Sequence, residues 1–277
     1  MPEFGGALAQ RYLTRMSLYD SLAPLYDELF PIDPRAPAFL DSLSRKAGVA
    51  AVPRALDAGC ATGSHALALA QLGWETFGID SEAAMIALAK EAARREGLEE
   101  RCAFVVGDIA AMEALVGDRL FDLALCLGNT LPHLAPPRGA EERDAGAAAF
   151  LERARALLAP GGSIALQMMN YARPGLGPGY VFPELKLRPE LGAREAVMRR
   201  KYLPPLEANA GTLRFVVELS RDGNTQVSET SLVPIAPRRI ETLLRNAGFQ
   251  APDFFSGWDG SPLEEGRDSF FIAVAGR

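Results

Sequence analysis

The feature that most constrains this chain is a short glycine-containing loop between an apolar run and a helix-forming run. The loop reads Asp57-Ala58-Gly59-Cys60-Ala61-Thr62-Gly63, and one element later a second apolar run ends in Gly78-Ile79-Asp80. This order predicts a strand, a tight turn, a helix, a second strand and a terminal carboxylate. That geometry is typical of sites that hold an adenosine-containing cofactor.

Two other nucleotide-binding loops fit the sequence less well. A dinucleotide loop needs G-x-G-x-x-G, but the frame that starts at Gly59 has Ala61 and Ser64 at its second and third glycine positions. A P-loop needs a lysine after its last glycine, and Gly63 is followed by Ser64 and His65. The remaining pattern is D-x-G-x-x-x-G, and an acid at the end of the first strand suits a cationic ligand better than an anionic one.

The pattern resembles the first motif of the class I S-adenosylmethionine-dependent methyltransferases, Asp/Glu-x-Gly-x-Gly-x-Gly. Asp57, Gly59 and Gly63 match it, and Ala61 replaces the central glycine. The resemblance implies that Asp80 accepts both ribose hydroxyls of S-adenosylmethionine and that Asp108 binds the adenine amino group. Two structural alternatives remain open, namely Asp80 as a helix cap and Asp108 as part of a common turn.

Further residues near these motifs are expected to contact the cofactor. They are Tyr19, Cys60, Ser81, Met85, Ile109, Leu127 and Gly128. Met85 is equally compatible with a place in the hydrophobic core, because methionine at helical spacing is often a core residue.

Apolar runs and helical patterns alternate along most of the chain. The apolar runs are 54–58, 74–79, 103–106, 121–127 and 164–169, and the helical patterns are 64–72, 82–96, about 141–158 and 237–247. For the helix 82–96 we expect Ser81 as the N-cap and a shared face formed by Met85, Leu88, Ala89 and Ala92. The alternation predicts a doubly wound, mostly parallel, seven-stranded Rossmann-like α/β sheet, closed by a C-terminal antiparallel hairpin from 252–258 and 269–274.

Three regions follow from this pattern. Residues 1–50 are expected to form an N-terminal helical flap, residues 51–170 and 236–277 the cofactor-binding core, and residues 171–235 an inserted substrate or lid subdomain. Within the insertion, 214–220 and 225–233 flank Asp222-Gly223-Asn224 and read as a β-hairpin. A cluster of cations, Arg194, Arg199, Arg200 and Lys201, either binds a carboxylate or forms a solvated helix face.

Candidate acceptor residues follow the fourth strand. The segment Leu127-Gly128-Asn129, with His133 four residues further on, resembles the glycine and sarcosine N-methyltransferases and related bacterial small-molecule enzymes. By this resemblance Asn129 and His133 contact the acceptor, and Tyr26 of the flap lies over the methyl group. The alternatives are a structural hydrogen bond for His133, and an amphipathic helix carrying Tyr19 and Tyr26. His65, just after the glycine loop, is interpreted as mostly structural.

Composition limits the partners. A net charge of −6 and a pI near 5.2 provide no basic field for nucleic acid. No apolar run is long enough for a membrane span, and the N-terminus lacks a secretory pattern, so we expect a cytoplasmic protein. Three widely spaced cysteines, Cys60, Cys102 and Cys126, indicate small buried side chains rather than disulfides or a metal site. The oligomeric state is not indicated.

The sequence therefore predicts a methyltransferase that uses S-adenosylmethionine and a small-molecule acceptor, an amine in particular. The main alternative is a regulatory or scaffold module that binds S-adenosylmethionine without transferring the methyl group. A nicotinamide oxidoreductase is disfavoured by the missing glycines. A methyltransferase for macromolecules is disfavoured by the acidic composition and by the lack of Asn-Pro-Pro-Tyr after the fourth strand.

Overall fold

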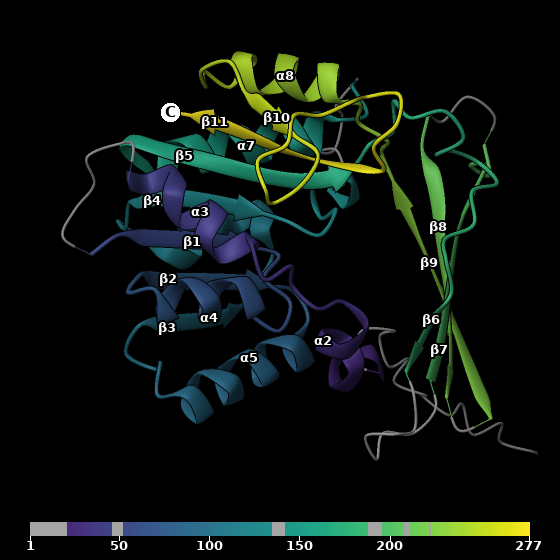
Figure 1. Cartoon of the computed structure of the whole chain (residues 1–277), viewed down its shortest axis with the longest axis horizontal. Coiled ribbons are helices and arrows are strands. Elements are labelled where there is room, and N and C mark those ends of the chain that lie inside the picture. The colour runs from purple at the N-terminus through teal and green to yellow at the C-terminus, as the bar shows by residue number, and fades with distance from the viewer. Residues whose placement is uncertain (1–20, 46–51, 135–141, 188–195, 208–210, 222) are drawn as a thin grey trace, which may run out of the picture.

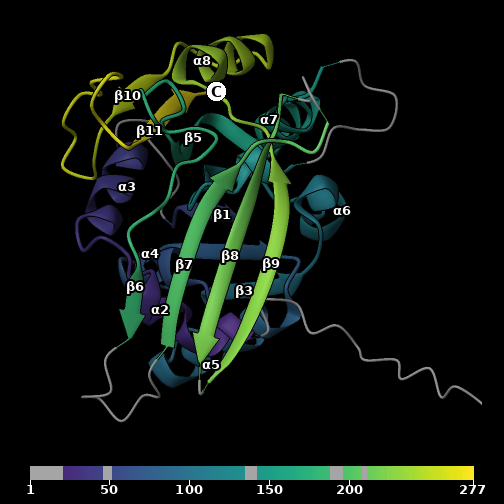
Figure 2. The same ribbon diagram turned by 90° about the vertical axis from the view of Figure 1, so that its right-hand side faces the viewer.

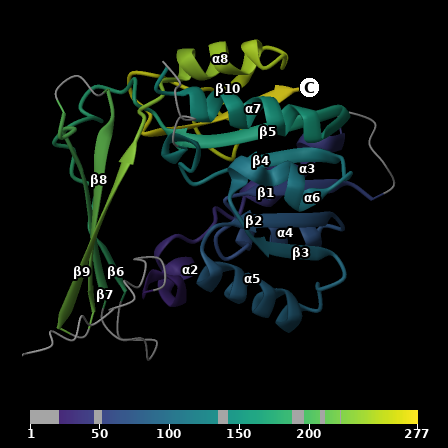
Figure 3. The same cartoon turned by 180° about the vertical axis from the view of Figure 1, so that it is seen from behind.

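The computed structural model describes residues 21–45, 52–134, 142–187, 196–207, 211–221 and 223–277. Within these residues the strands form a seven-stranded sheet and a separate four-stranded sheet. The four-stranded sheet stands across the edge at which the parallel strands of the larger sheet end (Figures 1 and 3). Seen from that side, it covers much of this edge (Figure 2).

The seven-stranded sheet is mostly parallel, as predicted. Its strands are β1 (Arg54–Ala58), β2 (Glu75–Asp80), β3 (Cys102–Val106), β4 (Phe121–Cys126), β5 (Leu158–Met169), β10 (Asp253–Phe255) and β11 (Phe270–Gly276). They lie in the order β10-β11-β5-β4-β1-β2-β3, and β11 is antiparallel to both β5 and β10. The predicted C-terminal hairpin is thus confirmed, with β10 shorter than the predicted run 252–258.

Helices cover both faces of this sheet, which explains why its strands are apolar on both sides. The α-helices are α2 (Tyr26–Leu29), α3 (Ala36–Arg45), α4 (Ser64–Gln71), α5 (Ala83–Glu96), α6 (Met112–Val116), α7 (Ala145–Leu157) and α8 (Pro237–Asn246). Short 3₁₀ turns are η1 (Ala23–Leu25), η2 (Ile109–Ala111) and η3 (Leu131–His133). One face packs against α6, α7 and α8, and the other against α3 and α4.

Two predictions for the helix after β2 are wrong in detail. Ser81 is not its N-cap, because α5 begins one residue later than predicted and its N-cap is Glu82. The N–H of Glu82 donates to the carboxylate of Asp80 at 2.9 Å. Leu88 is 37% exposed, and the buried face consists of Met85, Ile86, Ala89 and Ala93. The apolar stripe of α5 therefore turns away from Leu88 toward Ile86.

The insertion forms the four-stranded antiparallel sheet. Its strands are β6 (Leu185–Leu187), β7 (Ala196–Leu203), β8 (Leu213–Arg221) and β9 (Asn224–Leu232). The predicted hairpin corresponds to β8 and β9. The interpretation of the cation cluster as a helix face is wrong, because Arg199, Arg200 and Lys201 lie in β7, paired with β8. Arg194 lies outside the described residues.

The N-terminal segment, residues 21–30, packs between helix α5 and the four-stranded sheet. Leu22, Leu25 and Leu29 lie against side chains of β7 and β8, including Met198 and Val217. Tyr26 belongs to α2, while Tyr19 lies outside the described residues. No helix in the described part of the chain is both long and apolar enough to cross a membrane.

Candidate active site

The glycine loop is held against the end of β2. The N–H groups of Gly59 and Cys60 both donate to the carbonyl of Ile79, at 2.8 and 3.0 Å. The N–H of Ala61 donates to Oδ2 of Asp80 at 2.8 Å. The loop is therefore fixed on the strand whose carboxylate was predicted to bind the ribose.

The glycines of the loop are required by its backbone and by its neighbours. Gly59 and Gly63 have φ of 81° and 79°, which glycine adopts at little cost. A Cβ on Gly59 would lie 2.7 Å from Cγ2 of Thr130, and one on Gly63 would lie 2.7 Å from the ring of Phe104. Ala61 also has a positive φ, of 48°, so the loop keeps its turn without the central glycine of the motif.

Asp57 is a buried carboxyl group in β1, only 3% exposed, and no hydrogen-bond donor to it lies among the described residues. Burial, with a contribution from the charge of Asp80, raises the pKa of Asp57 to about 7. A cation bound beside it would favour the ionised form. The residues at this edge therefore fit S-adenosylmethionine, which carries a sulfonium and an ammonium group.

Asp80 is the last residue of β2, and Asp108 comes two residues after the end of β3. Both therefore lie at the same edge of the sheet as Asp57. Both carboxylates already accept backbone N–H groups. Asp80 accepts from Ala61 and Glu82, and Oδ1 of Asp108 accepts from Ala110 at 2.8 Å. An ionised carboxylate offers about four lone-pair sites, so these structural roles leave capacity for ribose hydroxyls and an adenine amino group.

The side chains of the other residues predicted to contact the cofactor differ in their exposure to solvent. Buried among them are Cys60, Met85, Ile109 and Leu127, and Ser81 is exposed. Burial raises the pKa of the Cys60 thiol well above its ordinary value, which makes it an apolar wall rather than a nucleophile. Gly128 has a φ of 67° and donates its N–H to Oε1 of Gln167 at 3.1 Å.

Asn129 is held in one orientation by the end of β5. It has a φ of 66°, unusual for a residue other than glycine. Its Oδ1 accepts the N–H of Met169 at 3.0 Å, and its Nδ2 donates to the hydroxyl of Tyr171 at 3.1 Å. The side chain predicted to meet the acceptor is thus positioned in advance.

A group of aromatic residues joins the two sheets beside Asn129. We call it the aromatic wall, and it consists of Tyr171, Tyr180, Phe182, Tyr202 and Phe215. The hydroxyls of Tyr171 and Tyr202 lie 3.2 Å apart. The sequence prediction missed this wall. The one sequence signal for it was Tyr171, two residues after the end of the fifth strand.

The two histidines lie at different places around the site. His133, in η3, has its ring centroid 6.1 Å from that of Phe215, and burial lowers its pKa, so the imidazole is neutral at pH 7. The ring centroid of His65 lies 6.1 Å from that of Trp258, and burial lowers the pKa of His65 to about 4. Only His133 borders the aromatic wall.

The N-terminal segment contacts the glycine loop directly. Oδ1 of Asp27 accepts hydrogen bonds from the hydroxyls of Thr62 and Ser64. The neighbouring Tyr26 has its ring 5.1 Å from that of Phe30. These contacts place α2 beside the loop, as a flap over the cofactor would require.

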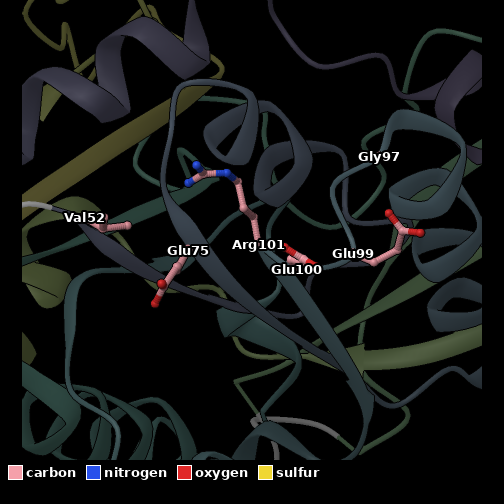
Figure 4. A pocket seen from close by; sticks show the side chains of 6 residues that line it. All are labelled: Val52, Glu75, Gly97, Glu99, Glu100 and Arg101. Carbon is pink, nitrogen blue, oxygen red and sulfur yellow. The ribbon is translucent and has the colours of Figure 1, made fainter.

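A separate open hollow of about 630 Å³ lies at the opposite edge of the sheet. Figure 4 shows its lining, which includes Glu75 at the start of β2 and Arg101 just before β3. Because the parallel strands begin here, the hollow is separated from the glycine loop by the length of the sheet. It is not part of the candidate active site.

Comparisons with known proteins agree with this geometry. A family model described as a methyltransferase domain matches residues 55–162. The glycine/sarcosine N-methyltransferase of Halorhodospira halochloris is 27% identical over 256 residues, which cover 92% of this chain and 87% of that protein.

Solved structures share the fold. An S-adenosylmethionine-dependent methyltransferase from Clostridium acetobutylicum ATCC 824 has a TM-score of 0.73 at 16% identity, over 94% of this chain and 99% of that one. The sugar N-methyltransferase KedS8 from Streptoalloteichus sp ATCC 53650 has a TM-score of 0.64 at 18% identity, over 99% and 96%. Both similarities extend beyond the core to nearly the whole chain.

Proposed function

Because the chain belongs to the class I S-adenosylmethionine-dependent methyltransferases, we propose that it transfers the methyl group to the nitrogen of a small-molecule amine. The observation that carries the proposal is the position of Asn129. Asn129 follows β4, the neighbour of β1, and β1 carries Asp57, which fits the cationic cofactor. The side chain of Asn129 is fixed by its hydrogen bond to Tyr171 of the aromatic wall.

Bound S-adenosylmethionine supplies an electrophilic methyl group and a neutral thioether leaving group. The chain would hold it through the ionised Asp57, through Asp80 at the ribose and through Asp108 at the adenine. Displacement at a sulfonium needs alignment and exclusion of water more than a protein nucleophile. The glycine loop and the N-terminal segment would align the cofactor, and the aromatic wall would exclude water.

The acceptor would lie between Asn129 and the aromatic wall. An amine attacks only in its neutral form, and a neutral His133 can take up the proton that the amine loses. We therefore propose Asn129 and His133 as acceptor contacts and Tyr26 as part of the cover. The names of two similar proteins support nitrogen as the methylated atom, since one is a glycine/sarcosine N-methyltransferase and the other a sugar N-methyltransferase.

The test is a transfer assay with methyl-labelled S-adenosylmethionine and a panel of small amines that includes glycine, sarcosine and amino sugars. We expect labelled product and S-adenosylhomocysteine only when an amine is present, with label on nitrogen by mass spectrometry. Binding of S-adenosylhomocysteine without transfer to any amine would favour the binding-module alternative. Label on oxygen or on protein would exclude the amine assignment.

A further inference from the structure

The inner face of the four-stranded sheet carries a guanidinium group that has no counter-charge within the described part of the chain. In β7 the side chains alternate, so that Met198, Arg200 and Tyr202 point toward the seven-stranded sheet, and Arg199 and Lys201 point away. Both outward cations are paired, Arg199 with Glu184 at 2.6 Å and Lys201 with Glu218 at 3.1 Å. Among the described residues, Arg200 has no such partner.

Arg200 is held by aromatic rings instead of by an acid. Its guanidinium carbon lies 4.9 Å from the ring centroid of Phe182 and 5.4 Å from that of Phe30. Its Nε is buried and makes no hydrogen bond within the described residues. Buried donors are normally satisfied, and burial lowers the pKa of Arg200, so the isolated charge is costly here. In a chain with a net charge of −6, a cation on an inner face that finds no acid among the residues the structure describes indicates a ligand.

The position of Arg200 relates it to the acceptor. Two residues along a strand span about 7 Å on one face, and Tyr202, two residues further on, reaches the hydroxyl of Tyr171 and through it Asn129. Arg200 therefore lies on the same face of β7 as the tyrosine that connects this strand to Asn129, the residue predicted to meet the amine. The fork of an arginine matches the paired oxygens of a carboxylate or a phosphate.

We propose that Arg200 binds an anionic group of the acceptor, so that the substrate is a small amine that also carries an oxyanion. The amine lies at Asn129, and the carboxylate or phosphate lies against the guanidinium between Phe30 and Phe182. This inference rests on the proposed function and narrows its substrate class.

The experiment measures binding, independently of turnover. Protein saturated with S-adenosylhomocysteine is titrated by calorimetry with glycine, β-alanine, 4-aminobutyrate and 5-aminopentanoate, and with the amide of each. Aminoalkyl phosphates of the same lengths form a second arm, which distinguishes phosphate from carboxylate. We expect at least one amine that carries a carboxylate or phosphate to bind at least about tenfold more tightly than the amide of the same chain length, which lacks the anionic group.

Variants assign this preference to one side chain. Arg200→Met should abolish it, Arg200→Lys should keep part of it because the charge remains without the fork, and the matched control Arg199→Met should leave it unchanged. The proposal is overturned if the wild-type protein does not prefer the anionic amines, or if Arg199→Met removes the preference as well. It is also overturned if Arg200→Met weakens uptake of S-adenosylhomocysteine about tenfold, since the guanidinium would then hold the cofactor carboxylate.

The two proposals fail in different ways. An anion preference without methyl transfer in the labelled assay would contradict the proposed function alone. Methyl transfer to amines that lack an anionic group, without tighter binding of the amines that carry one, would contradict only the role of Arg200.

Discussion

The carboxylate of Asp80 accepts the N–H of Ala61 at 2.8 Å, and this hydrogen bond ties the end of β2 to the turn of the glycine loop. Ala61 holds a positive φ of 48° there, a conformation that alanine adopts at some cost. The residue predicted to bind the ribose therefore also shapes the loop that lies beside the cofactor.

Asp80→Ala should weaken binding of S-adenosylmethionine at least tenfold, or about 1.4 kcal/mol. Hydrogen bonds from two ribose hydroxyls to a charged acceptor each contribute about 1.5 to 3 kcal/mol, and the loop also loses its anchor. Calorimetric titration measures the change. Asp122→Ala is the control, because Asp122 holds the N–H of Arg54 at the other edge of the sheet. Equal affinity in wild type and Asp80→Ala would contradict the ribose role.

Asp57 should make the stability of the free protein depend on pH. Its pKa is about 7 in the folded chain and about 3.9 when unfolded, so between these values the folded state binds more protons and stability falls as pH rises. The destabilisation is complete above about pH 7 and reaches up to about 4 kcal/mol. Asp57→Asn should therefore be more stable than wild type at pH 8, with the gain decreasing toward pH 4. Urea unfolding at pH 5 and pH 8 measures this difference.

The same group should make cofactor binding depend on pH in the opposite direction. A bound cation favours ionised Asp57, so affinity for S-adenosylmethionine should rise between pH 5.5 and 7, by up to about tenfold per unit. In Asp57→Asn this slope should disappear and the affinity at pH 7.5 should be lower. A wild-type affinity that is constant over this range would show that Asp57 stays protonated beside the cofactor.

The sequence predicted the core sheet well because its signals are local. The first two strands are apolar runs, each followed by a helix closed by glycine, at Gly73 and at Gly97, and the motif from Asp57 to Gly63 specifies the turn on its own. The seven strands and the hairpin of β8 and β9 followed from such patterns.

Local sequence patterns did not predict that β7 is a strand. Three consecutive cations, Arg199 to Lys201, hide the alternation of a half-buried strand, because the middle one lies on the inner face among aromatic rings. What makes β7 a strand is pairing with β8 and the contacts with Phe30 and Phe182, which come from distant parts of the chain. The hydrogen bond between Tyr171 and Tyr202 depends on the same pairing and was missed for the same reason.

Asp27 should couple the N-terminal segment to the cofactor site. Its carboxylate accepts the hydroxyls of Thr62, which is buried, and of Ser64. Asp27→Ala leaves the Thr62 hydroxyl without its acceptor, a loss of about 1 to 3 kcal/mol. We expect weaker cofactor binding, by about threefold to tenfold, and faster proteolysis near α2. Asp33→Ala, which removes a surface ion pair with Arg35 in the same segment, should change neither. If both variants behave alike, Asp27 has no special role in this coupling.

His133 should act as the base for the acceptor amine. Burial lowers its pKa, so the imidazole is neutral and able to accept a proton throughout the neutral range, and it loses this ability only below its ordinary pKa of about 6.5. Wild-type kcat/KM should therefore fall on the acid side below that value. In His133→Asn we expect kcat/KM at pH 7.5 to drop at least about tenfold and this histidine-dependent acid limb to disappear, because asparagine keeps a hydrogen bond but cannot titrate. His65→Asn, at the other buried histidine, is the control and should retain both. Turnover of His133→Asn that matches wild type from pH 6 to 9 would exclude the base role and leave His133 as a structural neighbour of Phe215.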